Sequence, residues 1–344
     1  MPKNKVQFQR GMGLREFMDK YGTTEQCEQA LFAWRWPRGF VCPECGHTAY
    51  CALKGRRLIQ CNACRRQTSV TAGTLFAGSK LPLSVWFLAM HLIGQAKNGI
   101  SSLELSRQLA ISQNSAWLMK HKLMQAMLER DAGRQLKGLV QLDDAYWGGR
   151  RRGGKRGRGT RGKTPFVAAV ETDAAGRPRR MSFNRVKGFR SKEIARWSRT
   201  KLAPGTTVHS DGLACFAAVN QAGCTHRPTV MSGPGIERRR LALTWVDTML
   251  GNVKNAIHGT YHAIREKHLP RYLAEYSYRF NRRFDLASML ARLATAAANT
   301  PPMPYRLVKL AEAHWYSGFR LAAVEPLQCA AVFYFSPEST PNGH

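Results

Sequence analysis

The sequence predicts a multidomain protein in which a small cysteine-bearing module and a helical module precede an α/β domain. Three observations support this fold class. Two CxxC pairs lie fifteen residues apart near the N-terminus, a stretch rich in Leu, Met and Trp without internal proline follows, and short β-type runs begin at Leu139. With 344 residues the chain is long enough for two or three domains of about 100–200 residues each.

Changes in composition and in hydrophobic periodicity divide the chain into consecutive segments. Four β-type runs, LVQLDD, FVAAVET, RPRRMSFNRV and TTVHSDG, mark the α/β domain, and helical periodicity returns from about residue 239. The expected segments are N-terminal helices in 1–40, the cysteine module in 41–75, a helical module in 80–133, the α/β domain in 138–315 and a polar tail in 329–344.

The charge of the chain is strongly unbalanced, with 53 Lys and Arg against 22 Asp and Glu and a net charge of +31. Such a charge favours a polyanionic partner, nucleic acid first, although an anionic membrane surface or ribosomal RNA would account for it equally well. The 44% hydrophobic content excludes general disorder. Because no run approaches the ~18 apolar residues of a membrane span, no membrane partner is expected.

Nine cysteines are an odd number, and four of them form the two CxxC pairs Cys42, Cys45, Cys61 and Cys64. The absence of a secretory signal and this cysteine usage favour a reducing, cytoplasmic compartment over a disulfide framework. Two residues between thiolates allow one tight turn to present both sulfurs to a single tetrahedral ion. We therefore expect the four cysteines to bind structural zinc; a redox dithiol is the alternative.

The segment Ser102–Trp117 has the pattern of a helix-turn-helix. Ile111 is the apolar residue of the turn, and Ser112 can cap the second helix. We expect that helix to present Gln113, Asn114 and Lys120 outward, so that short polar side chains at its start meet base edges in the major groove of DNA. An ordinary helical hairpin inside a core is the alternative.

Three aspartates stand out in a chain with few acidic residues. Asp143 and Asp211 each end an apolar β-type run, and Asp247 lies on a helix that also carries Lys254 on the same face. Three converging carboxylates can hold two divalent ions ~3.5–4 Å apart, which is the arrangement that cleaves phosphodiesters. Magnesium prefers such oxygen ligands. An aspartate in such a position, taken singly, is more often a turn residue or a helix cap. Together with the cysteine module, the helix-turn-helix pattern and the net charge of +31, the three favour a catalytic triad.

Several motifs resemble those of ISXO-like insertion-sequence transposases, in collinear order from about Gly13 to Asp285. They are LDDAYWGG, GRGxxxKTPFVAAVE, HSDG, GNVKNAIHGTYH and KHLPRYLAEYSYRFNRR. The resemblance implies an RNase H-like catalytic domain that cuts and joins DNA through Mg²⁺, behind an N-terminal zinc ribbon. It also implies a bacterial, nucleoid-associated enzyme that acts as a homodimer or larger assembly on DNA.

The resemblance assigns roles to individual residues. The first and second catalytic aspartates of the family match Asp143 and Asp211, and the nearby lysine matches Lys254. The third metal ligand, Glu or Asn in the family, falls on Asp247, which departs from the pattern but keeps an oxygen ligand. A Glu–Arg–Arg signature matches Glu275, Arg279 and Arg282, spaced along one helix face. We interpret the two arginines as DNA contacts; a surface ion-pair stripe is the alternative.

A basic, glycine-rich insertion at 150–163 follows the first of these aspartates. It holds eight basic residues and five glycines and no acidic residue, so it cannot bury apolar area on its own. We expect it to contact DNA phosphates beside the active site, rather than to be merely a solvated loop. The proposed contacts are Arg150, Arg151, Arg152, Lys155, Arg156 and Arg158.

The expected function is therefore that of a DNA transposase. It binds the ends of an insertion sequence in double-stranded DNA, hydrolyses phosphodiesters with two metal ions, and uses the freed 3′-OH to join target DNA. One alternative is a domesticated relative that binds specific DNA sequences without cleaving them. Another is a zinc-ribbon RNA-binding protein of the ribosomal machinery, which would leave the three carboxylates unexplained.

Overall fold

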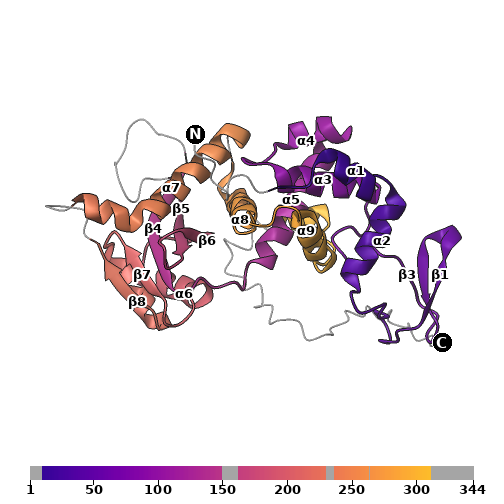
Figure 1. Ribbon diagram of the computed structural model, residues 1–344, viewed down its shortest axis with the longest axis horizontal. Coiled ribbons are helices and arrows are strands. Elements are labelled where there is room, and N and C mark those ends of the chain that lie inside the picture. The colour runs from indigo at the N-terminus through magenta and orange to yellow at the C-terminus, as the bar shows by residue number, and fades with distance from the viewer. Residues whose placement is uncertain (1–9, 149–161, 230–235, 263, 311–344) are drawn as a thin grey trace, which may run out of the picture.

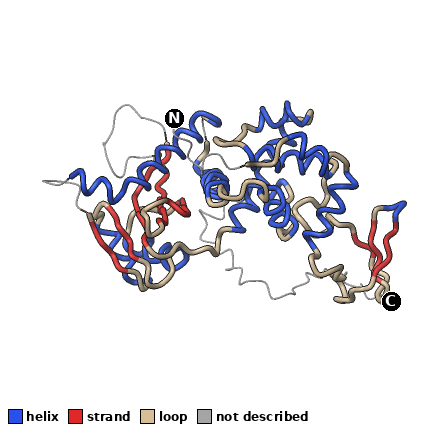
Figure 2. The backbone as a smooth tube through the Cα atoms, viewed as in Figure 1, coloured by secondary structure: helices blue, strands red, loops and turns tan. Residues whose placement is uncertain are grey.

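The computed structural model describes residues 10–148, 162–229, 236–262 and 264–310. Strands gather in two separate places: a mixed sheet on the left of Figure 2 and a small hairpin sheet on the right, with helices between them. The five-stranded sheet is built from the middle of the chain, and the three-stranded sheet from its N-terminal part. None of the helices in the described part has the length and apolar composition that crossing a bilayer requires.

Six helices form one helical body around a common hydrophobic core. Five come from the N-terminal third of the chain: α1 (Leu14–Tyr21), α2 (Thr24–Arg35), α3 (Leu83–Gln95), α4 (Ser102–Leu109) and α5 (Gln113–Arg130). The core is rich in large apolar side chains with little or no solvent exposure, such as Phe87 and Leu105. Burying each such side chain stabilises the fold by about 1.5–3 kcal/mol.

The sixth helix of this body, α9 (Met289–Ala298), comes from the far end of the described chain. Its residues Met289 and Leu293 are fully buried against the N-terminal helices, and the backbone N–H of Leu75 donates to the carbonyl of Ala297 at 3.1 Å. The segment 138–315, which we expected to form one α/β domain, is therefore divided. Its last part belongs to the helical body, because the apolar face of α9 packs there.

A short turn joins α4 to α5. The α4 helix ends at Leu109, and the next residue, Ala110, adopts a left-handed backbone conformation with φ of 52°. The hydroxyl of Ser112 then accepts the backbone N–H of Ser115 at 3.2 Å, which caps the start of α5. The two helices are thus separated by only three residues, and Ile111 packs against the core of the helical body.

The larger sheet has the order β6-β5-β4-β7-β8. Its strands are β4 (Leu139–Trp147), β5 (Thr164–Thr172), β6 (Pro178–Arg185), β7 (Thr207–Ser210) and β8 (Thr225–Pro228). The first three strands form an antiparallel meander, whereas β7 and β8 run parallel to β4. This order and orientation are those of an RNase H-like sheet, which the resemblance implies. The sequence analysis did not predict β8.

Helices cover both faces of this sheet. On one face, α6 (Ser191–Lys201) and the 3-10 helix η2 (Ala214–Ala222) pack on Val140, Leu142 and Val208. On the other face lie α7 (Ile236–Tyr261) and α8 (Leu269–Phe280), which cover apolar residues of β5 and β6. In Figure 1, α7 crosses the sheet and α8 lies between the sheet and the helical body.

Candidate active site

Two aspartates meet because of the register of two parallel strands. Leu142 on β4 pairs with Ser210 on β7, and the next residue of each strand is an aspartate, Asp143 and Asp211. Neighbouring strands lie about 4.8 Å apart, so these two side chains are held side by side. Their strand positions place them on the face of the sheet that α7 covers, because Val140 and Leu142 point to the opposite face.

A third carboxylate joins them from the adjacent residue. One ligand oxygen from each of Asp143, Asp144 and Asp211 lies within 4.8 Å of the others, and all three side chains are half-buried. The backbone N–H of Asp144 donates to Oδ1 of Asp143 at 2.8 Å, which orients the first carboxylate. From the sequence, Asp144 and Glu171 are the residues to replace Asp247 as the third ligand if Asp247 lies apart, and of these two Asp144 joins the cluster.

Asp247 lies on α7 and is exposed. Among the described residues it is outside the group of carboxylates within 4.8 Å of one another. Partial desolvation of its carboxylate and then the charge of Asp211 raise its pKa, and Asp247 in turn contributes to the raised pKa of Asp143. The third predicted carboxylate is therefore close enough to act electrostatically on the other two, without forming part of the tight cluster.

The cluster is electrostatically strained when no cation is bound. Burial, and then the charges of Asp144 and Asp211, raise the pKa of Asp143 to about 7. Carboxylates that repel one another in this way form a favourable site for a divalent cation, which neutralises them. The donor set consists of oxygen atoms alone, so it fits magnesium better than a softer metal.

Two further charged residues, Lys254 and Glu171, lie outside the carboxylate cluster. Lys254, predicted beside the metal ions, lies partly exposed on α7, seven residues after Asp247 and thus about two helical turns away. Glu171 is a further acidic residue of the sheet and lies on β5, beside the start of β4. It pairs in register with Val140, and its Oε2 accepts the backbone N–H of Lys137 at 3.1 Å. Glu171 therefore does not contribute to the carboxylate cluster.

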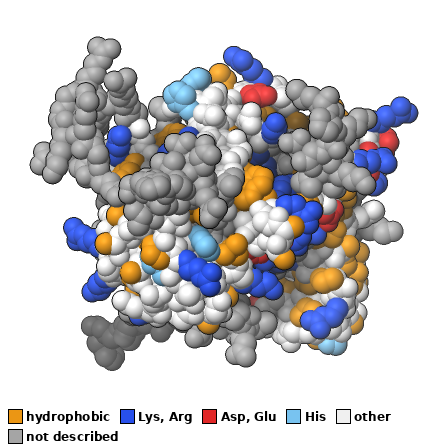
Figure 3. Space-filling view, turned by 60° about the vertical axis from the view of Figure 1, so that its left-hand side comes forward, with side chains coloured by type: hydrophobic (Ala, Val, Ile, Leu, Met, Phe, Trp, Pro, Cys, Tyr) orange, Lys and Arg blue, Asp and Glu red, His pale blue; other side chains and the backbone are white. Residues whose placement is uncertain are grey.

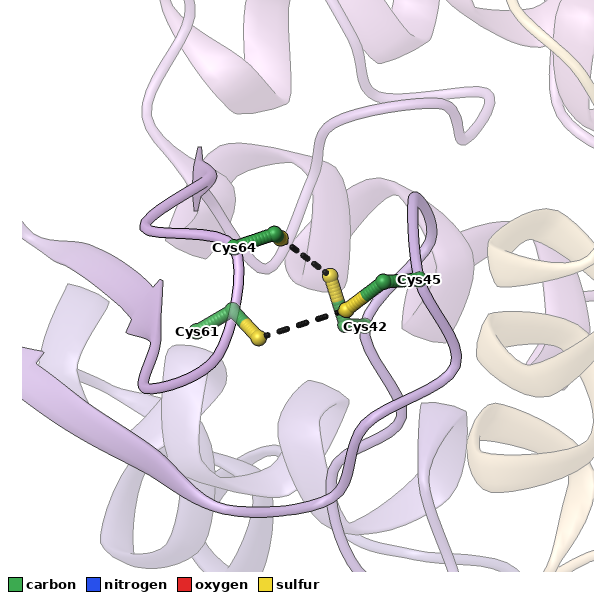
Figure 4. Close-up of side chains that lie close together, drawn as sticks. All are labelled: Cys42, Cys45, Cys61 and Cys64. Carbon is green, nitrogen blue, oxygen red and sulfur yellow. Dashed lines mark hydrogen bonds between the residues drawn. The ribbon is translucent and has the colours of Figure 1, made fainter.

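The four cysteines of the two CxxC pairs converge, as Figure 4 shows. The hairpin β1 (Tyr50–Leu53) and β2 (Leu58–Cys61), extended by β3 (Gln67–Thr68), brings the second pair back to the first. The Sγ atoms of Cys42 and Cys64 lie 3.6 Å apart, as do those of Cys45 and Cys61. Thiolates at about 2.3 Å from a tetrahedral zinc ion are about 3.8 Å apart, so the geometry fits zinc and excludes a disulfide.

The two turns that carry these cysteines have the same backbone design. After the first pair, Gly46 has a φ of 73°, and its N–H donates to the carbonyl of Cys42. After the second pair, Arg65 has a φ of 58°, and its N–H donates to the carbonyl of Cys61. Each turn therefore points both of its sulfurs toward the same centre, as the spacing predicts.

Comparison with known protein families gives separate matches for the zinc ribbon and for the domain that contains the five-stranded sheet. Residues 22–67 match the transposase zinc-ribbon domain, and residues 135–281 match the ISXO2-like transposase domain. The chain belongs to this transposase family. The zinc-ribbon match begins within the helical body, which agrees with the packing of Phe32 and Trp36 against Cys42 and Cys61.

One curated relative of the transposase is an uncharacterized protein in transposable element ISH50 of Halobacterium salinarum. It is 24% identical over 217 residues, covering 58% of this chain and 71% of that protein. Among solved structures, a pre-cleavage Mos1 transpososome and the Mos1 strand transfer complex match at 8% and 9% identity. Each covers 58% of this chain, and 77% and 76% of the Mos1 chains, with TM-scores of 0.20 and 0.21. These TM-scores are too low to show a shared fold.

The residues predicted to contact DNA fall into three groups in the transposase. Gln113 and Asn114, at the start of α5, are exposed, as expected. Lys120 is not: its side chain is 1% exposed, and its Nζ donates to the carbonyl of Ile100 at 2.8 Å. The prediction that Lys120 contacts DNA is therefore wrong, because this side chain points into the protein toward α8.

The two arginines of the Glu–Arg–Arg signature are also buried. Arg279 donates to the backbone carbonyls of Ala96 and Lys97, and Arg282 forms a bidentate ion pair with Asp131 at 2.7 and 2.9 Å. Their interpretation as DNA contacts is wrong, since their donors are used inside the protein. The predicted contacts of the basic insertion, Arg150, Arg151, Arg152, Lys155, Arg156 and Arg158, lie outside the described residues.

Proposed function

We propose that this transposase cleaves DNA at the ends of an insertion sequence and joins the freed 3′-OH ends to target DNA. The observation that carries the proposal is the convergence of Asp143 and Asp144, in the middle of β4, with Asp211, directly after the parallel strand β7, and with Asp247 in electrostatic range. In a chain of net charge +31, such a cluster opposes the overall electrostatic trend and serves to hold cations.

In this proposal Asp143 and Asp211 would hold divalent metal ions, and Asp247 on α7 would supply a further carboxylate ligand. Bound Mg²⁺ ions would supply charge stabilisation for the attacking and leaving oxygens of a phosphodiester. Asp144 donates its backbone N–H to Asp143 and so fixes the orientation of that carboxylate. Lys254, on the same helix as Asp247, contacts a phosphate of the bound strand. Because water and then the 3′-OH act as nucleophiles, no nucleophilic side chain is required.

The DNA itself is held by several parts of the transposase. The helix-turn-helix of α4 and α5 presents Gln113 and Asn114 to base edges, and the insertion 150–163 contacts phosphates beside the carboxylates. Lys and Arg side chains recur over the face of the molecule in Figure 3, whereas Asp and Glu are sparse, which favours contact with a polyanion. The enzyme acts as a homodimer or larger assembly on paired ends, on the DNA of the bacterial cytoplasm.

The test is a cleavage assay on DNA that carries the element's own ends. The transposase with Mg²⁺ should cut at the element boundary and leave a 3′-OH, and it should not do so when Mg²⁺ is omitted. Replacing Mg²⁺ by Ca²⁺, which favours a larger and more flexible oxygen shell, should allow binding but slow cleavage. Sequence-specific binding with no cleavage under any divalent cation would support the domesticated, non-cleaving alternative instead.

A further inference from the structure

The helix α8 carries an unusual buried charged stripe. Along one side of this helix and in the turn directly after it, four ionisable residues recur at helical spacing and are each at most 8% exposed. On the opposite side, Leu269 and Leu273 pack on the five-stranded sheet. The four charged residues, which we call the α8 clamp, are Arg271, Glu275, Arg279 and Arg282.

Most partners of the α8 clamp belong to the helical body. Arg271 donates to the side chain of Gln125 on α5 at 2.9 Å, and Arg282 forms its bidentate pair with Asp131, directly after α5. Arg279 donates to the carbonyls of Ala96 and Lys97, which follow α3. The clamp therefore binds the C-terminal half of α5 and the chain before α4 to a helix of the catalytic domain.

The centre of the clamp is an almost solvent-free charge pair. Lys120 on α5 and Glu275 on α8 are 1% and 2% exposed, with 3.6 Å between Nζ and Oε2. The Nζ atom also lies 3.7 Å from the ring centroid of Tyr261, whose hydroxyl donates to Glu275 at 3.1 Å. Such a buried pair contributes little net stability compared with apolar residues, but its directional bonds are satisfied in one arrangement only.

The α8 helix also binds the edge of the catalytic sheet. The side chain of Asn281 accepts the N–H of Met181 at 2.8 Å and donates to its carbonyl at 2.9 Å, on the edge strand β6. Arg283 donates to the carbonyls of Pro178 and Arg179 on the same strand. Hydrogen bonds and an ion pair thus hold the C-terminal end of α8 to the sheet on one side and to the helical body on the other.

We propose that the α8 clamp fixes the angle between the helical body and the catalytic sheet and thereby determines at which nucleotide the DNA is cut. This inference rests on the proposed function, because it requires that α5 binds the element end and that Asp143 and Asp211 cut it. If both sites act on one DNA, the distance between the start of α5 and the carboxylates selects the scissile phosphate. Successive base pairs are 3.4 Å apart along the helix axis, so a small rotation between the two bodies moves the cut. The clamp residues are positioning residues and do not touch DNA.

The test compares two clamp variants with a matched control. Lys120→Met with Glu275→Gln removes both central charges and retains a partner for the Tyr261 hydroxyl; Asp131→Asn is a milder change at a partly exposed position. The control is Asp285→Asn, which removes an ion pair to Arg292 that is 49% exposed on both sides and lies outside the clamp. Zinc content and thermal unfolding establish that each variant is folded.

Two measurements test the role of the clamp, and together they distinguish its failure from a failure of the proposed function. The first is the cut position on element-end DNA at nucleotide resolution. The wild type and the control should cut at one position, and the clamp variants at several neighbouring positions, with unchanged affinity for the end. The second is the distance distribution between bioorthogonal labels at the exposed positions Gln108 on α4 and Lys192 on α6, since the native cysteines preclude thiol labelling. It should be narrow in the wild type and broad in the clamp variants.

These results decide the inference in each case. A folded clamp variant that keeps a narrow distance distribution and a single cut position would overturn it. If the wild type makes no cut on any DNA, the proposed function fails, and the distance measurement alone still decides whether the clamp holds the two bodies. If Asp131→Asn folds but Lys120→Met with Glu275→Gln does not, the comparison is made with Asp131→Asn alone.

Discussion

The side-chain oxygen of Gln141 accepts the backbone N–H of Val246 at 3.0 Å, and that of the preceding residue, Trp245, at 2.9 Å. Gln141 lies on β4 two residues before Asp143, and Val246 lies on α7 directly before Asp247. One buried amide therefore holds the strand of Asp143 to the helix of Asp247.

Replacing the Gln141 amide should lower DNA cleavage through the position of Asp247, without loss of DNA binding. Gln141→Met removes the two hydrogen bonds that the side chain accepts, at about 0.5–1.5 kcal/mol each in the free energy of unfolding. Cleavage should fall as Asp247 loses its position, while DNA binding is retained. The control is Gln135→Met, since Gln135 is exposed and makes a single bond to Arg199; its effect should stay within about 0.5 kcal/mol. Equal cleavage by both variants would contradict the role of Gln141.

The carboxylates should differ in their importance for cleavage. Asp143→Ala and Asp211→Ala should each lower the cleavage rate by about a hundredfold or more, since each removes a ligand of the proposed metal ions. DNA binding should persist or tighten, because a negative charge is removed. Asp247→Asn should be the mildest change and Asp247→Ala severe. Asp173→Asn, in an exposed turn of the same domain, is the control. Full cleavage by Asp247→Ala would remove this residue from the site.

The cluster should make the stability of the transposase depend on pH. The pKa of Asp143 is raised to about 7, above its unfolded value near 3.8, mainly by burial. Between these two pH values the native state binds more protons than the unfolded state, so the free energy of unfolding falls as pH rises from about 4 to about 7. Asp143→Asn should flatten this fall and be more stable than the wild type at pH 8, by on the order of 1–3 kcal/mol.

Denaturant unfolding of both proteins at pH 4.5 and 8, with no divalent cation other than the structural zinc, measures this effect. Added Mg²⁺ should then raise the stability of the wild type at pH 8, because it binds the ionised cluster of the native state. The same addition should have less effect on Asp143→Asn. Parallel pH profiles for the two proteins would show that Asp143 is not the group responsible.

The four cysteines should bind one zinc ion per chain. X-ray absorption should show four sulfur neighbours at about 2.3 Å, and Cys42→Ser should lower the zinc content and weaken end binding by local unfolding of the ribbon. The five-stranded sheet should remain folded in that variant. Cys51→Ser is the matched control, because Cys51 lies exposed on β1 and outside the group of four. Loss of zinc in the control as well would indicate a different ligand set.

The basic insertion should contribute affinity without sequence preference. Replacing Arg150, Arg151, Arg152, Lys155 and Arg156 by Ala should weaken binding to element ends and to random DNA by similar factors. The slope of log affinity against log salt should become less steep by about 0.9 for each phosphate that the variant no longer neutralises. Fluorescence anisotropy at several salt concentrations measures both quantities. An unchanged slope would show that the insertion does not contact phosphates.

Local patterns predicted the local parts of this structure well. The zinc ribbon follows from cysteine spacing, and the match to the transposase zinc-ribbon domain confirms it. The family itself is also confirmed, by that match and by the match of residues 135–281. Asp143 and Asp211 could be singled out because each directly follows an apolar run that forms a parallel strand. These features depend on neighbours in the sequence or on simple rules of sheets.

Long-range partners account for what the sequence did not show. From the local sequence Lys120 is expected to point outward, but Ile100, Tyr261 and Glu275, all distant in the sequence, surround its buried ammonium group. The burial of Arg279 and Arg282 could not be predicted from their neighbours in the sequence, because the groups that accept their hydrogen bonds lie far away in the chain. The α9 helix shows an apolar face, but no pattern in it indicates which core it joins. Tertiary contacts override the usual preference of charged residues for solvent in these cases.

The return of α9 to the N-terminal helices has a consequence for synthesis on the ribosome. Residues 14–130 leave the ribosome long before Met289 and Leu293, which fill their shared core. Until then the helices made first lack part of their packing and keep apolar surface exposed. A chain truncated before α9 would be a substrate for proteases rather than a free DNA-binding fragment. Every molecule whose helical body is complete therefore already carries the whole catalytic sheet, which lies between the two parts of that body in the order of translation.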